Sequence, residues 1–136
     1  MTNRPVLVDT SVWVDYLRNG RSKEAEILDQ MLCAGLVVTC EPVKAEIISG
    51  APTKSEFERL RVLLGSLLSL NVSLDVWESI AEHRFVLARK GIQASLIDLW
   101  IVAAAREHAL AIWTLDQDFH RMNKVIPFEI FHPDVS

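Results

Sequence analysis

Short, continuous apolar runs separated by longer amphipathic segments constrain this chain more than any other feature of its sequence. Residues 5–9, 36–39 and 111–114 are apolar almost throughout, which is typical of central strands in a parallel sheet covered on both faces. The segments between these runs carry apolar residues at helical spacing. This alternation predicts an α/β fold with a mainly parallel sheet between helical layers.

Capping residues, glycines and prolines set the expected ends of the remaining elements. We expect helices over about 10–19, 22–34, 42–49, 55–70, 75–90 and 95–108, and further short strands at 71–74 and 128–131. The fourth of these helices begins at Thr53 or Ser55, and Ser55 with Glu58 matches the spacing of a capping box. Ser95 with Asp98 matches the related Ser-x-x-Asp pattern.

The size and composition predict one globular domain over residues 1–136. Apolar residues make up 50% of the chain and charged residues 24%, which is too hydrophobic for a disordered protein. The longest apolar run, Leu99 to Ala105, is far shorter than the roughly 20 residues that cross a bilayer. No signal-like segment precedes Asp9, so we expect a cytoplasmic protein without membrane contact.

The net charge and the two cysteines exclude some functions. A formal charge of −4 argues against broad, non-specific affinity for nucleic acid, although it does not exclude a nuclease that gathers negative charge in its own site. Cys33 and Cys40 have no cysteine or histidine at zinc-finger spacing. We expect both to be buried, reduced thiols.

Four acids are expected at the edge of the sheet where the strands have their carboxyl ends, which is where open α/β sheets bind ligands. Asp9 and Asp116 follow buried strands, while Glu46 and Asp98 lie on the first turns of helices, so all four start from the same rim of the sheet. If these carboxylates meet, two charges about 4 Å apart repel by roughly 4 kcal/mol at an effective dielectric constant near 20. Such a group needs a cation or bound protons, and oxygen ligands suit hard divalent ions such as Mg²⁺.

Some of these acids also have ordinary explanations. Asp98 fits a helix start with Ser95, which needs no active site. Glu46 fits a solvated acid beside Lys44. Asp118 is open between facing a metal ion and capping the turn that follows it.

The acidic segments resemble a known family. The segments are "VLVDTSVWVDYL" at 6–17, "VKAEIISG" at 43–50, "ARKGIQASLIDLWIVAAA" at 88–105 and "WTLDQDF" at 113–119. In order and spacing they resemble the four acidic motifs of PIN-domain ribonucleases, especially the small VapC-type toxins of toxin–antitoxin pairs. The resemblance covers nearly the whole chain.

The resemblance implies a three-layer α/β/α sandwich, Mg²⁺ or Mn²⁺ as cofactor, and endonucleolytic cleavage of RNA. Residue by residue, Asp9, Glu46, Asp98 and Asp116 match the metal-binding acids, Asp118 matches an additional acid, and Ser11 and Thr114 match hydroxyl positions near the site. It also implies a small antitoxin partner and a homodimer or larger toxin–antitoxin assembly. A first metal held mainly by Asp9, Asp98 and Asp116, with a second recruited through Glu46, is the expected arrangement; the assignment of acids to metals is open.

The apolar excess fits such partners. The mean hydropathy is +0.21, and the expected helix at 55–70 is apolar around most of its circumference. A helix of this kind favours a dimer or an antitoxin groove, with deep burial in the monomer as the alternative.

Two other functions remain to be weighed. A haloacid-dehalogenase-like phosphohydrolase also ends its first strand with aspartate, but it requires a second aspartate where this chain has Ser11. A catalytically inactive interaction module is disfavoured because all four acids are present. The RNA substrate is left open, since its selection depends on rim cations that the sequence does not place, namely Arg18, Arg21, Lys44, Arg84 and Arg89.

Overall fold

A four-stranded parallel sheet forms the centre of the chain. The computed structural model describes residues 3–133. Its strands are β1 (Val6–Val8), β2 (Val37–Cys40), β3 (Leu68–Leu70) and β4 (Ala111–Trp113). They lie in the order β3-β2-β1-β4, and every neighbouring pair is parallel.

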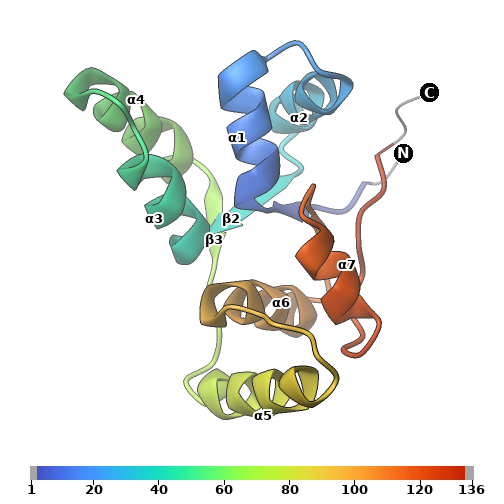
Figure 1. The fold of residues 1–136 in the computed structure, drawn as a ribbon. Helices are drawn as coiled ribbons and strands as arrows, with labels where there is room; N and C mark the ends of the chain where they lie inside the picture. The colour runs from blue at the N-terminus through green and yellow to red at the C-terminus, as the bar shows by residue number, and fades with distance from the viewer. Residues whose placement is uncertain (1–2, 134–136) are drawn as a thin grey trace.

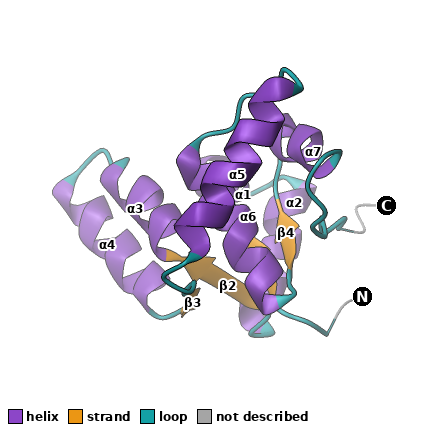
Figure 2. Cartoon of the chain, turned by 90° about the horizontal axis from the view of Figure 1, so that it is seen from below, coloured by secondary structure: helices purple, strands orange, loops and turns teal. Residues whose placement is uncertain are grey.

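Helices cover both faces of this sheet. They are α1 (Thr10–Asn19), α2 (Lys23–Cys33), α3 (Glu41–Ser49), α4 (Lys54–Gly65), α5 (Val76–Arg89), α6 (Leu96–His108) and α7 (Gln117–Asn123). Helices α1 and α2 lie above the sheet in Figure 1, and α6 lies below it with α5 packed on its outer side. Helices α3 and α4 form a hairpin beside β2 and β3, which is also visible from below in Figure 2. The predicted α/β/α sandwich with a parallel sheet is confirmed.

The strand order reverses beside β1. The chain runs from β1 outward through β2 to β3 and then returns to place β4 on the opposite side of β1. Val6 pairs with Val37 on one side and with Ala111 on the other. The carboxyl ends of β1 and β4 therefore flank the switch point at which open parallel sheets bind ligands.

Buried apolar side chains fix these elements in place. The residues of β1, β2 and β4 are buried throughout, as a parallel sheet covered on both faces requires. Helix α6 buries Leu99, Ile101 and Val102 between the sheet and α5. Each such side chain contributes roughly 1.5–3 kcal/mol when it leaves water. This packing sets the position of the first turn of α6, which carries Asp98.

The predicted helix at 55–70 is wrong at its C-terminal end. Helix α4 ends at Gly65, and Leu68–Leu70 instead forms the edge strand β3, in which Leu68 pairs with Val38 of β2. Leucine has a high helix propensity, so the local pattern favoured a longer helix, whereas the pairing with β2 is a non-local interaction. Leu60 and Leu64 are buried within the monomer, while Val62 remains 66% exposed.

Three other local predictions are also corrected. Residues 71–74 form a loop, because strand pairing begins three residues earlier, at Leu68, and ends at Leu70. The expected strand at 128–131 is reduced to one parallel bridge between Ile112 and Ile130. Helix α4 is capped by the Thr53 hydroxyl, which accepts from the backbone N–H of Glu56; Thr53 was one of the two predicted starts, and the expected box from Ser55 is not the cap.

The cysteines differ in exposure. Cys40 is buried at the end of β2, as expected, but Cys33 is exposed at the end of α2, which contradicts the expectation of two buried thiols. The buried residues of α2, which are Ala25, Leu28 and Met31, lie on one face of the helix, and Cys33 lies outside that face. Within residues 3–133, no helix is long and apolar enough to cross a membrane.

Candidate metal centre

Asp9 is held at the end of β1 by hydroxyl groups. It is 5% exposed and caps α1. Its Oδ2 accepts hydrogen bonds from Ser11 Oγ at 2.8 Å and from Thr114 Oγ1 at 2.9 Å. A buried carboxylate needs such donors, since an unpaired charge of this kind is strongly destabilising. The two hydroxyls therefore fix the orientation of the Asp9 carboxylate.

The same hydroxyls connect the two strand ends. Ser11 Oγ accepts from the backbone N–H of Leu115 at 2.9 Å, and Thr114 Oγ1 accepts from the backbone N–H of Asp116 at 3.0 Å. The segment after β4 is thus tied to the segment after β1. This network sets the position of Asp116 relative to Asp9.

Asp116 and Asp118 lie at the start of α7, a helix that was not predicted. Asp116 is its N-cap, and Asp116 Oδ1 accepts from the backbone N–H of Asp118 at 2.9 Å. The side chain of Asp118 forms an ion pair with Arg121, at 2.6 Å between Oδ1 and Nη1. The capping role that the sequence left open for Asp118 therefore belongs to Asp116.

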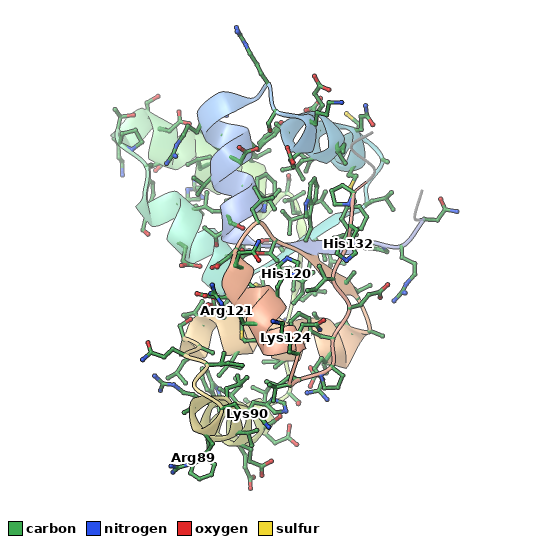
Figure 3. All side chains as sticks on the ribbon, turned by 45° about the vertical axis from the view of Figure 1, so that its right-hand side comes forward. Arg89, Lys90, His120, Arg121, Lys124 and His132 are labelled. Carbon is green, nitrogen blue, oxygen red and sulfur yellow. The ribbon has the colours of Figure 1, made fainter. Side chains whose placement is uncertain are left out.

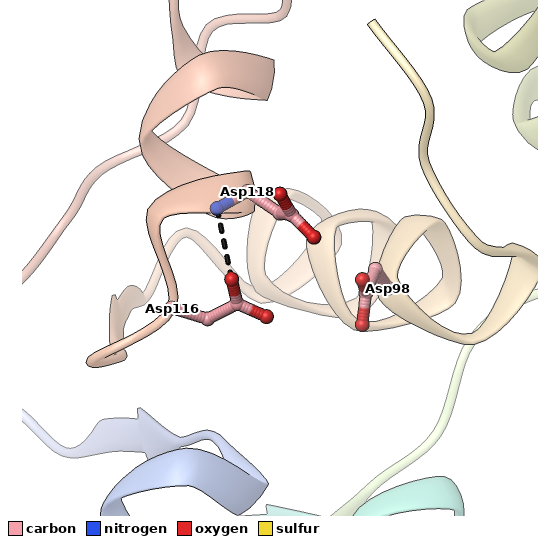
Figure 4. A group of neighbouring side chains, drawn as sticks. All are labelled: Asp98, Asp116 and Asp118. Carbon is pink, nitrogen blue, oxygen red and sulfur yellow. Dashed lines mark hydrogen bonds between the residues drawn. The ribbon is translucent and has the colours of Figure 1, made fainter.

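Three carboxylates converge at this rim. Asp98, Asp116 and Asp118 each offer an oxygen, and these oxygens lie within 4.8 Å of one another (Figure 4). Asp98 comes from α6, whose start is capped by the hydroxyl of Ser95, as predicted. In the part of the chain that the structure describes, this is the group of acids that could hold a metal ion.

The crowding changes the ionisation of Asp98. Burial and the negative charge of Asp9, with smaller contributions from Asp116 and Glu46, raise the pKa of Asp98 from 3.8 to about 6, while the hydrogen bond with Ser95 lowers it. The four predicted acids therefore act electrostatically on one another. A carboxyl with a raised pKa beside other carboxylates is typical of a cation-binding or proton-binding site.

Asp9 and Glu46 lie outside this group of three, and both act on Asp98 through their negative charge. Both hydroxyl groups bind Oδ2 of Asp9, and among residues 3–133 no hydrogen bond to its Oδ1 is found. Glu46 is oriented by Thr10, whose Oγ1 donates to Glu46 Oε1 at 3.0 Å. Both acids are available for ligands beyond the Asp98 group.

Sequence reasoning missed Arg121, which pairs with Asp118. This pair could have been found from the i,i+3 spacing in a short helix that begins at Asp116. Arg84 was named among the possible rim cations but not placed, and the structure shows that it lines a cavity with Asp98 and Asp118. Its position could not be predicted, because it depends on how α5 packs beside α6 and α7.

The fold and this site define a class of protein. Residues 6–125 match the PIN domain family. This match spans most of the chain, and the chain belongs to the PIN-domain family.

Several proteins within this family are similar to the chain. VapC ribonuclease Mb1587 of Mycobacterium bovis is 34% identical over 118 residues, which cover 84% of this chain and 88% of that protein. Ribonuclease VapC5 of Mycobacterium tuberculosis is 31% identical over 126 residues, covering 91% and 92%. A solved VapBC-5 toxin–antitoxin structure from Mycobacterium tuberculosis matches with a TM-score of 0.66 and 28% identity, covering 95% of this chain and 98% of the other.

Proposed function

We propose that this chain is the toxin of a type II toxin–antitoxin pair and that it cleaves RNA as a metal-dependent endoribonuclease. The observation that carries the proposal is the convergence of Asp98, Asp116 and Asp118 beside Asp9 at the switch point of the sheet. Relatives named as VapC ribonucleases, each matched over most of its length, support the same function.

The residues fit a divalent cation. Asp98, Asp116 and Asp118 would supply carboxylate oxygens, and Asp9, whose Oδ2 already accepts two hydroxyl hydrogen bonds, would supply another through Oδ1. Mg²⁺ and Mn²⁺ both prefer such ligands. When bound, the ion would lower the pKa of a coordinated water and offset negative charge on a phosphodiester.

The other residues of the site orient these acids. Ser11 and Thr114 hold the Asp9 carboxylate in one direction, and Thr10 holds Glu46 toward the same rim. Glu46 is the candidate ligand for a second ion that arrives with substrate. Asp98 retains a proton more readily than an ordinary aspartate and would release it when a cation binds.

Basic side chains support an anionic polymer as substrate: Arg121 pairs with Asp118, and Arg84 lines a cavity with Asp98 and Asp118. Figure 3 shows further cations on one side of the molecule, with Lys124 directly after α7 and Arg89 and Lys90 at the end of α5. Cations at the rim can bind a nucleic-acid backbone even though the whole chain is acidic.

Partners follow from the same relatives. The solved neighbours include VapBC toxin–antitoxin complexes, which supports an antitoxin protein as the partner of this chain. We also propose a homodimer or larger assembly and a cytoplasmic location. Copurification with the product of a neighbouring open reading frame, sedimentation of the complex and cell fractionation test these three points.

A cleavage assay tests the enzymatic proposal. Single-stranded RNA should be cut with Mg²⁺ or Mn²⁺, and EDTA or Asp98→Asn should abolish the cut. Glu26→Gln, which changes an exposed acid on α2, is the matched control and should cleave normally. Turnover of a phosphate monoester without RNA cleavage would instead favour the phosphohydrolase, although the position of its acid–base aspartate is occupied by Ser11. Absence of both activities would favour the interaction module.

A further inference from the structure

A cavity of about 530 Å³ opens beside the acidic group. Its walls are the second half of α5, the loop between α5 and α6, and the first turns of α6 and α7. Asp98 and Asp118 line it, so the cavity and the carboxylates in Figure 4 share one surface. Its volume is in the range of sites for small ligands, about 300–1,000 Å³.

Arg84 is the one cation among the described residues that line this cavity. Within residues 3–133 it has no hydrogen bond or ion pair, so its charge is available to a ligand. The cavity between α3 and α4 is different, because its Lys44 and Arg61 are already paired with Glu41 and Glu58. The free guanidinium next to the acidic group is therefore a specific feature of this cavity.

The rest of the lining suits a nucleoside. Ala88, Ile92 and Ala94 provide aliphatic surface for a base or a ribose. Gln93 provides amide donors and an acceptor, and it has no hydrogen-bond partner in the described range. Proteins read unstacked bases of single-stranded RNA through apolar contacts and polar groups of this kind.

Two positive charges in this site would each bind one phosphate of the RNA. A cation held by Asp98 and Asp118 would take the phosphate that is cleaved, and Arg84 can take a second phosphate because guanidinium groups bind phosphate oxygens in pairs. We propose that this cavity holds the nucleotide adjoining the scissile phosphate and that Arg84 binds the phosphate on the far side of that nucleotide. The inference rests on the proposed function, since it requires RNA cleavage at the acidic group.

Substitutions of single arginines test the role of Arg84. Arg84→Gln should lower kcat/KM for a short single-stranded RNA by about 10- to 100-fold, the loss expected for one charge-assisted hydrogen bond. Arg84→Lys should recover part of that loss, because it keeps the charge. Arg59→Gln is the matched control, because Arg59 is an exposed arginine on α4 that pairs with Glu56 and does not line the cavity. An equal loss from Arg84→Gln and Arg59→Gln would overturn the proposal in favour of general attraction.

A substrate change gives the sharper readout. After the cleaved linkage is mapped, a neutral methylphosphonate is placed at either flanking linkage. The parent protein should bind one of these two substrates more weakly than the unmodified RNA. The Arg84→Gln protein should bind that same substrate and the unmodified RNA equally well, because the contact is already lost. Equal losses in both proteins at both linkages would overturn the subsite. If the parent cleaves no RNA, the proposed function itself fails; if it cleaves and Arg84→Gln changes nothing, only the subsite fails.

Discussion

Replacing Asp98 by asparagine should stabilise the protein when no metal is present. The substitution keeps the size of the side chain and removes its charge from a group of carboxylates. A pKa raised from 3.8 to about 6 means that ionised Asp98 destabilises the folded state. Each tenfold change in the ionisation constant corresponds to about 1.4 kcal/mol, so the full cost near neutral pH is about 3 kcal/mol.

The measurable gain is smaller than this limit. Asp98 is partly exposed, and solvent screens its interactions, which leaves about 1–2 kcal/mol. For a chain of this size that corresponds to an increase in Tm of roughly 4–8 °C. The gain depends on pH. Below about pH 3 the carboxyl is protonated in both states and the two proteins should be equally stable; the difference should grow between about pH 4 and about pH 6 and stay constant above that.

Thermal unfolding in EDTA and in Mg²⁺ provides the assay. Saturating Mg²⁺, at about 100 times its Kd, should stabilise the parent by about 2.7 kcal/mol, and the Asp98→Asn protein should respond less. Glu26→Gln should match the parent under both conditions. The reasoning is refuted if Asp98→Asn is no more stable than the parent in EDTA near neutral pH, or if it keeps the full response to Mg²⁺.

Three further predictions concern other parts of the structure. Thr114→Val removes a hydrogen-bond donor to the buried Asp9 carboxylate and should lower the unfolding free energy, measured by urea titration, by about 1.5–3 kcal/mol. The control Thr39→Val removes a buried hydroxyl without a partner and should leave the stability unchanged or raise it. Gly91→Ala places a side chain at a φ of +76° and should lower the unfolding free energy by about 1 kcal/mol, read from the midpoint of the same titration. Cys33 should react rapidly with a thiol reagent in the folded protein, while Cys40, whose pKa burial raises to about 11, should react only on unfolding.

The central sheet could be predicted because its strands are buried on both faces. Strands of that kind are continuous buried runs, which the local sequence pattern shows directly. The edge strand β3 could not be predicted, since Leu68 is 68% exposed and the segment is a strand only through its pairing with β2. Local pattern carries no information on such a pairing.

Helix α7 has a recognisable start and a buried face in its own sequence. Asp116 begins it as an N-cap, and Phe119 and Met122 follow at helical spacing and are buried. Recognising this helix would have placed Asp118 and Arg121 on adjacent turns.

The acidic rim itself followed from strand ends and helix starts, whereas its contacts with neighbouring elements did not. The hydroxyls at positions 11 and 114 were expected only through the family resemblance. The distance from Thr114 to Asp9 depends on the pairing of β1 with β4, which brings residues far apart in the chain together.

The charge balance of the site leads to a final prediction. Three helices, α1, α6 and α7, begin beside the carboxylates, and a helix N-terminus stabilises a nearby negative charge by about 0.3–1 kcal/mol. Together these ends offset less than the roughly 4 kcal/mol by which one close pair of carboxylates repels. The remainder has to come from a proton on Asp98 or from a bound cation, and the two compete for the same group.

Affinity for Mg²⁺ should therefore decrease as the pH falls through about 6, by about tenfold for each further pH unit when one proton must be released. Calorimetric titration of the parent protein with Mg²⁺ across this pH range measures the effect. Asp98→Asn should bind Mg²⁺ more weakly and lose most of this pH dependence, because the group that holds the competing proton is gone. An Mg²⁺ affinity in the parent that is unchanged between neutral pH and about pH 5 would contradict the competition and with it the shared site.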